Sequence, residues 1–186
     1  MRQNLILCLA LVFLALASSG CGVTMRTQAT SVPDLAVKPG SIFVVSNTPN
    51  LDKYMFGVGR KAAVRLVEEF QDRDIKAWSY DQGSLNLARK TVDDSLMNCE
   101  PEAVLVLVEK LGLVSKSWGS TSVKEFEIES SLMLPGSENV VWRARTTCKV
   151  EGSPSLRETY IKLTEQILVK LAAKDIVPEG HLSSKK

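Results

Sequence analysis

The stretch Val123–Val150, which reads VKEFEIESSLMLPGSENVVWRARTTCKV, decides the fold of this chain. Apolar side chains recur at every second position on both sides of Pro135-Gly136. A period of two is typical of half-buried β-strands, and Pro-Gly is a turn signal. The stretch therefore predicts an antiparallel hairpin with one apolar and one charged face. The predicted apolar face carries Phe126, Ile128, Leu132, Leu134, Val140, Trp142, Ala144, Cys148 and Val150.

The charged face of this hairpin has acids on one strand and bases on the other. Because paired residues must point to the same side, two registers are open. A loop over residues 135–137 sets Glu129 opposite Arg143, whereas a loop over residues 135–139 sets Glu129 opposite Arg145. Both registers pair acid with base, so cross-strand pairing alone explains the pattern. The alternative is an interaction face for a neighbouring subunit, made of Glu125, Glu127, Glu129, Arg143 and Arg145.

Further strands and helices are predicted from apolar periodicity upstream and downstream of the hairpin. The predicted strands are Ser41–Ser46, Lys76–Tyr80 and Ala103–Val108, the last continuing toward Ser122 with a bend at Gly112. The predicted helices are Gly57–Gln71, Ser84–Met97 and a segment that Ser155 and Glu158 cap. The order β-α-β-α-β-β-β-α predicts an α/β fold, a mixed-sheet sandwich with an antiparallel C-terminal hairpin. A single domain is expected over residues 41–178, followed by a disordered tail at 179–186.

The chain begins with a short apolar run, Leu5–Ala17, behind one basic residue, Arg2. The run is too short to cross about 30 Å of hydrocarbon, and small residues follow it, so residues 1–20 are predicted to be a signal peptide. The alternative is a short buried N-terminal helix. Residues 21–40 are polar and rich in small side chains, which predicts a flexible tether.

The residues Ser19-Gly20-Cys21 resemble the lipobox of bacterial lipoproteins, although Ser18 stands where that family usually has Leu. The resemblance implies cleavage before Cys21 and three acyl chains on it, palmitate among them, which would anchor the protein in a membrane. Gly22 follows, rather than the Asp that retains many such lipoproteins in the inner membrane. The resemblance therefore implies an outer-membrane protein that faces the periplasm.

The four cysteines are expected to have three fates. Cys8 leaves with the signal peptide and Cys21 is acylated, which leaves Cys99 and Cys148. In an oxidising compartment such a pair predicts a disulfide bond, and two buried thiols are the alternative. Two isolated cysteines without histidine support make a metal site improbable.

The composition excludes several classes of function. With 186 residues, 45% of them hydrophobic, the chain can bury a core, and a net charge of +2 excludes strong electrostatic binding of nucleic acid. The single histidine, His181, lies in the predicted tail and offers no orientable base. We therefore expect no enzyme activity, no cofactor and no metal. Trp78, Trp118 and Trp142 could line a ligand cleft, although the parity of Trp142 points into the core.

The lipidated start, the element order and the hairpin LPGSENVVWRART together resemble a broad group of bacterial envelope lipoproteins. The group includes the curli-secretion lipoprotein, the Pel-polysaccharide lipoprotein and the N-terminal domain of the Tol translocation protein. Val140–Ala144 match its short motif, whereas Pro135–Asn139 lack its usual order of acid and glycine. The resemblance covers roughly residues 41–177 and implies a non-enzymatic assembly or secretion adaptor, a homo-oligomer or one with envelope partners. The alternative is a ligand-binding lipoprotein that carries a lipid or a glycan.

Overall fold

A computed structural model describes residues 22–32, 37–55, 57–81, 96–117, 120–136, 139–151 and 155–180, without the side chains of residues 81 and 111–124. The predicted signal peptide, Cys21, most of the Ser84–Met97 helix and the tail from His181 lie outside these residues.

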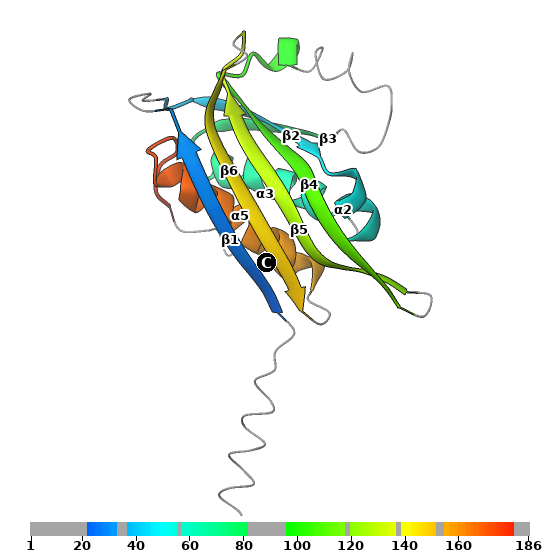
Figure 1. Cartoon of the computed structure of the whole chain (residues 1–186). Helices are drawn as coiled ribbons and strands as arrows, with labels where there is room; N and C mark the ends of the chain where they lie inside the picture. The colour runs from blue at the N-terminus through cyan, green and yellow to red at the C-terminus, as the bar shows by residue number, and fades with distance from the viewer. Residues whose placement is uncertain are drawn as a thin grey trace, which may run out of the picture.

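Six strands form one mixed sheet in the order β1-β6-β5-β4-β2-β3 (Figure 1). β2 pairs in parallel with both β3 and β4, and the remaining neighbours are antiparallel. The strands are β1 (Gly22–Ser31), β2 (Ser41–Asn47), β3 (Lys76–Asp81), β4 (Ala103–Ser117), β5 (Ser120–Met133) and β6 (Val140–Glu151). The mixed α/β sheet predicted from the sequence is therefore present, with one strand more than predicted.

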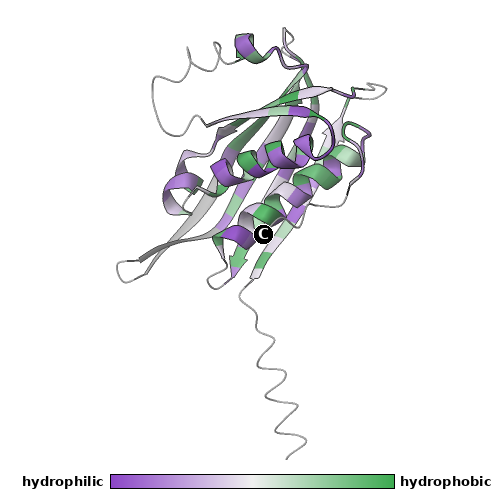
Figure 2. Ribbon diagram, turned by 180° about the vertical axis from the view of Figure 1, so that it is seen from behind, coloured by the Kyte–Doolittle hydropathy of each residue, from purple (hydrophilic) through white to green (hydrophobic). Residues whose placement is uncertain are grey.

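The helices cover one face of this sheet (Figure 2). They are α2 (Pro49–Tyr54), α3 (Val58–Gln71) and α5 (Leu156–Ala172), and residues 96–99 add a short helical turn. The predicted cap of α5 is confirmed, because Glu158 donates its backbone N–H to Ser155 Oγ at 3.0 Å. No described helix is both long enough and apolar enough to pass through a lipid bilayer.

α3 packs close to the end of β2 through a glycine. A Cβ atom at Gly59 would collide with the side chain of Thr48, which is fully buried. Any larger residue at position 59 would push the helix away from the sheet. Gly57, with φ of 81°, provides the left-handed turn that starts α3.

Part of the segment predicted as a flexible tether is instead the edge strand β1. Gly22–Ser31 pairs along its whole length with β6, and Val23 is only 5% exposed. Lys162 of α5 donates to the Val23 carbonyl at 3.1 Å, and Thr27 bonds Thr146 of β6 at 3.0 Å. The described fold therefore already includes Gly22–Ser31, upstream of the predicted start at Ser41. The prediction failed because an edge strand with one side to solvent needs few apolar residues.

The pairing of β5 with β6 follows the second of the two predicted registers. Glu129 lies opposite Arg145 and Glu125 opposite Lys149. The turn differs in detail, because a register irregularity follows Leu132 and β5 ends at Met133. The bend expected at Gly112 coincides with two irregularities between β4 and β5. These two strands continue past their neighbours as a projecting hairpin (Figure 1).

The core lies between the sheet and the helices α3 and α5. Its largest fully buried side chains come from every layer, namely Trp142, Phe70, Phe126, Ile42, Leu51, Leu66, Leu105, Leu107, Ile128, Leu132 and Leu163. The strand residues among them share one parity, as alternation requires. The opposite face of the sheet remains for other contacts.

Candidate interaction face

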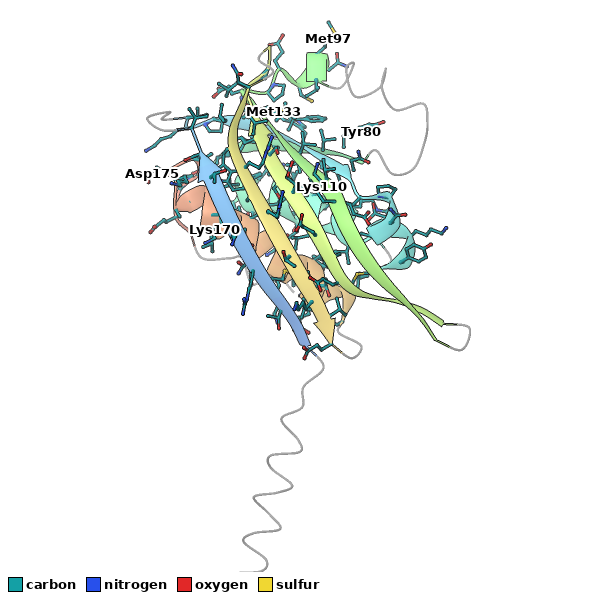
Figure 3. All side chains as sticks on the ribbon, in the orientation of Figure 1. Tyr80, Met97, Lys110, Met133, Lys170 and Asp175 are labelled. Carbon is teal, nitrogen blue, oxygen red and sulfur yellow. The ribbon has the colours of Figure 1, made fainter. Side chains whose placement is uncertain are left out.

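The predicted charged residues of β5 and β6 lie together on the sheet face that points away from α3 and α5. We call Lys110, Glu127, Glu129, Arg143 and Arg145 the charged sheet face. Their side chains alternate with the core residues of the same strands, so the packing of the core directs them outward. The sticks in Figure 3 show that Lys110 of β4 lies on this side.

Glu129 is the centre of the charged sheet face. Its carboxylate lies 3.6 Å from Lys110 Nζ, 3.7 Å from Arg143 Nε and 3.8 Å from a terminal guanidinium nitrogen of Arg145. Arg145 also reaches Glu127, with 3.3 Å between Nε and Oε1. Three cations therefore share two carboxylates, and Glu125 stands apart without an ion pair among the described residues.

The arginines are held loosely in this arrangement. Their separations exceed the usual 2.7–2.9 Å of a charge-assisted hydrogen bond. The Arg143 and Arg145 side chains are 52% and 58% exposed, whereas that of Glu129 is 14% exposed. Exposed pairs of this kind contribute about 0–1 kcal/mol each. The geometry therefore leaves the guanidinium groups available for carboxylates on another molecule.

The other half of the same face is apolar. Phe43 and Val45 of β2 and Val104 of β4 are buried there, and Trp78, Tyr80, Leu96, Cys99 and Val106 pack partly against them. The same side of the sheet thus changes from apolar at β3, β2 and the first residues of β4 to charged at Lys110 of β4 and at β5 and β6. Tyr80 and Lys110, both labelled in Figure 3, mark these two halves.

The predicted disulfide is not formed, because Cys99 and Cys148 are both free thiols. Cys148 is buried in the core beneath the helices, whereas Cys99 packs on the opposite face of the sheet. The sheet separates the two sulfur atoms, and of the two thiols only Cys148 is buried, whereas Cys99 is partly exposed. Burial raises the pKa of Cys148 from 9.0 to about 12, against a smaller opposing effect of the Lys162 charge.

The two described tryptophans, Trp78 and Trp142, lie on opposite faces of the sheet. Trp142 is 1% exposed in the core, as its parity predicted, and Trp78 lies on the other face of the sheet. Trp118 lies outside the described residues. The lipid- or glycan-carrier alternative, which depended on a cleft near Trp78 and Trp118, stays a prediction.

Sequence reasoning missed a basic groove on the outer side of the helices. The groove lies between α3 and α5, and Arg60, Lys61 and Arg157 contribute to its lining. The missed signal was the adjacent bases Arg60 and Lys61 in the first turn of α3, where acids are usual. In the part of the chain that the structure describes, no cluster of His, Cys, Asp or Glu could hold a metal ion.

Two solved structures resemble this fold along nearly their full length. The PelC dodecamer from Paraburkholderia phytofirmans matches with a TM-score of 0.52 and 16% identity, over 84% of this chain and 100% of that one. A variant of that PelC with one leucine-to-methionine substitution, also a dodecamer, matches with a TM-score of 0.51 and 16% identity, over 82% and 99%. At this identity the likeness establishes the fold alone. No family model and no curated protein matches the chain.

Proposed function

We propose that this protein is a non-enzymatic lipoprotein, anchored through Cys21, that assembles into a homo-oligomeric adaptor in the bacterial envelope. The observation that carries the proposal is the shared fold, which covers 100% of a PelC chain that forms a dodecamer. The lipobox-like residues that end in Cys21 supply the membrane address. An outer-membrane, periplasm-facing location and a role in secretion or assembly belong to this proposal.

The charged sheet face supports assembly because its cations lie outermost. Arg143 and Arg145 are more than half exposed and share carboxylates over long distances. Exchanging Glu129 for a carboxylate of a neighbouring subunit would cost little, since the present pairs are weak. Such charges give an interface its register and orientation more than its affinity.

The position of β1 supports the anchor. The strand starts at Gly22, which directly follows Cys21. An acylated Cys21 would hold every subunit at one height above the bilayer and with one end facing it. Subunits aligned in this way meet in two dimensions rather than three, which favours closed symmetric assemblies.

Oligomeric mass is the direct test. The mature lipoprotein is extracted from membranes in a mild detergent, and its protein mass is measured by light scattering. We expect the wild-type protein to be a homo-oligomer. The double variant Arg143→Glu with Arg145→Glu should be dissociated, whereas the control Lys53→Glu, on the exposed side of α2, should leave the oligomer intact. A strictly monomeric wild-type protein, without envelope partners after cross-linking in native membranes, would overturn the adaptor proposal.

The anchor has its own test. Substitution of Cys21 by Ser should prevent both the acylation of residue 21 and the cleavage of the signal peptide. The mass of the protein in the membrane fraction, measured by mass spectrometry, reports both losses. If the variant is processed and still fractionates with the outer membrane, the lipid anchor is wrong.

A further inference from the structure

The groove between α3 and α5 is strongly basic. It has a volume of about 590 Å³ and is lined by Arg60, Lys61, Arg65 and Arg157, with Glu68 as the single acid in its wall. We call it the basic groove. Its cations come from two helices, so the fold and not a local run of sequence brings them together.

Only part of this charge is neutralised within the protein. Arg65 is bound on both sides, at 2.9 Å by Glu68 and at 2.6 Å by the fully buried Glu69. Among the described residues, neither Arg60 nor Lys61 has an ion-pair partner, and both side chains are exposed. The groove therefore presents uncompensated positive charge to its surroundings.

The wall of the basic groove is also apolar in part. Val64 is 46% exposed between the two helices, and Tyr160 and Ile161 are half-buried beside it. A partner that carries negative charge next to apolar groups fits such a surface better than a small inorganic anion does. The chemistry of the groove matches the boundary between phosphate headgroups and acyl chains.

The basic groove lies at the end of the domain where the chain begins. Lys162 directly follows the groove residue Ile161, and its Nζ lies 3.1 Å from the Val23 carbonyl oxygen. Cys21 precedes Val23 by two residues, so their Cα atoms are at most about 7 Å apart. The headgroup layer on each side of a bilayer is about 5–8 Å deep. An acyl anchor on Cys21 would therefore hold this end of α5, and the groove beside it, close to the headgroup layer.

From this juxtaposition we infer that the basic groove binds the phosphate headgroups of anionic phospholipids and orients the domain on the membrane. The inference rests on the proposed anchor at Cys21. The acyl chains supply attachment, and the groove fixes the end and side of the domain that face the bilayer. Each basic residue close to an anionic membrane strengthens the binding of a protein to that membrane about fivefold.

Hydrogen exchange on the anchored protein tests this. The mature lipoprotein is reconstituted into vesicles of phosphatidylcholine alone or of phosphatidylcholine with phosphatidylglycerol. Exchange is then followed in peptides that cover the first turns of α3 and α5. In the anionic vesicles we expect exchange of these peptides to slow about fivefold or more, an effect that high salt removes.

Charge variants identify the groove as the cause. Arg60→Glu with Lys61→Glu should return exchange to the rate seen in neutral vesicles, and Arg60→Lys with Lys61→Arg should keep the protection. Acids in the first turn of a helix are favourable, so the reversed variant is expected to fold. The matched control is Lys170→Glu with Lys174→Glu at the other end of α5, which should keep the protection.

Each other outcome overturns the inference. Equal exchange in both vesicles means that the groove does not meet the headgroups, and loss of protection in the control variant means a nonspecific charge effect. Protection in detergent that grows with protein concentration means that a second copy of the chain fills the groove. Flotation separates the two proposals: protein that floats with both vesicles but shows no protection keeps its anchor and loses only the groove. Protein that floats with neither vesicle loses both.

Discussion

The face of the sheet beneath α3 and α5 and the face opposite it are filled in different ways. Beneath the helices, side chains such as Phe126 and Cys148 are completely buried. On the opposite face of the same strands, Glu127 and Arg145 are joined by a pair 3.3 Å long and remain open to solvent. Each of the strands β5 and β6 therefore stabilises the fold through the residues on one face. The residues on its other face are free to contact another molecule. Five predictions test this division.

The largest effect is expected from adjacent residues of β5 that face opposite ways. Phe126→Ala should lower the free energy of unfolding by about 3–5 kcal/mol, because it leaves a cavity in the core. Glu127→Ala should lower it by about 1 kcal/mol or less, because an exposed ion pair is lost. Chemical denaturation of both variants measures the two values. Similar losses would break the distinction between the faces.

The second prediction compares the two free thiols. At pH 8, a pKa of about 12 in place of 9.0 leaves Cys148 with roughly a thousandth of the thiolate of an ordinary thiol. Cys99, partly exposed on the other face, should react first with an alkylating reagent in the native protein. Mass spectrometry after timed alkylation gives the order. If neither cysteine reacts when the protein is denatured in the absence of a reductant, the two form a disulfide and the prediction is wrong.

The raised pKa of Cys148 also predicts how stability depends on pH. Above pH 9 the thiol ionises in the unfolded chain but stays protonated in the folded one, so the unfolded state binds fewer protons. The contribution of this group is complete below pH 9 and is lost as the pH rises toward about 12. Cys148→Ala should flatten the fall in unfolding free energy over this interval, measured by denaturation at several pH values.

The fourth prediction applies the comparison to β1. Val23→Asp places a charge on the buried side of the strand and should cost about 2–3 kcal/mol of stability. Thr24→Asp changes the neighbouring exposed residue and should have little effect. A segment that behaved as a loose tether would tolerate both substitutions equally, as thermal unfolding would show.

The smallest effect on stability is expected at the charged sheet face itself. Arg145→Ala should change the free energy of unfolding by less than about 1 kcal/mol, since both of its pairs are long and exposed. The same variant should weaken self-association, measured by analytical ultracentrifugation in detergent. If Arg145→Ala leaves the oligomer intact but strongly lowers the free energy of unfolding, the charged sheet face serves stability rather than association.

Sequence predicted those parts of the molecule in which one residue in two is strongly apolar. The alternation around Trp142 fixed two strands, their faces and a choice of two registers. It could not choose between the registers, because both pair Glu129 with an arginine. β1 was missed since beyond Val23 and Met25 its inward positions are Thr27 and Ala29, which look like linker residues.

The cysteines show a second limit. Cysteines can be counted in a sequence, but their pairing depends on which face of the sheet each one reaches. Cys99 lies on the face opposite that of Cys148. The basic groove was missed for a related reason, because Lys61 and Arg157 meet only when α3 and α5 lie side by side.

The strand β1 also has a mechanical consequence. A pull applied at the residue before Gly22 runs along β1, while the hydrogen bonds to β6 lie across it. The 10 residues of the strand are then loaded together in shear, rather than one after another as in a zipper. Force between a membrane and this domain would therefore be resisted by the whole pairing of β1 with β6.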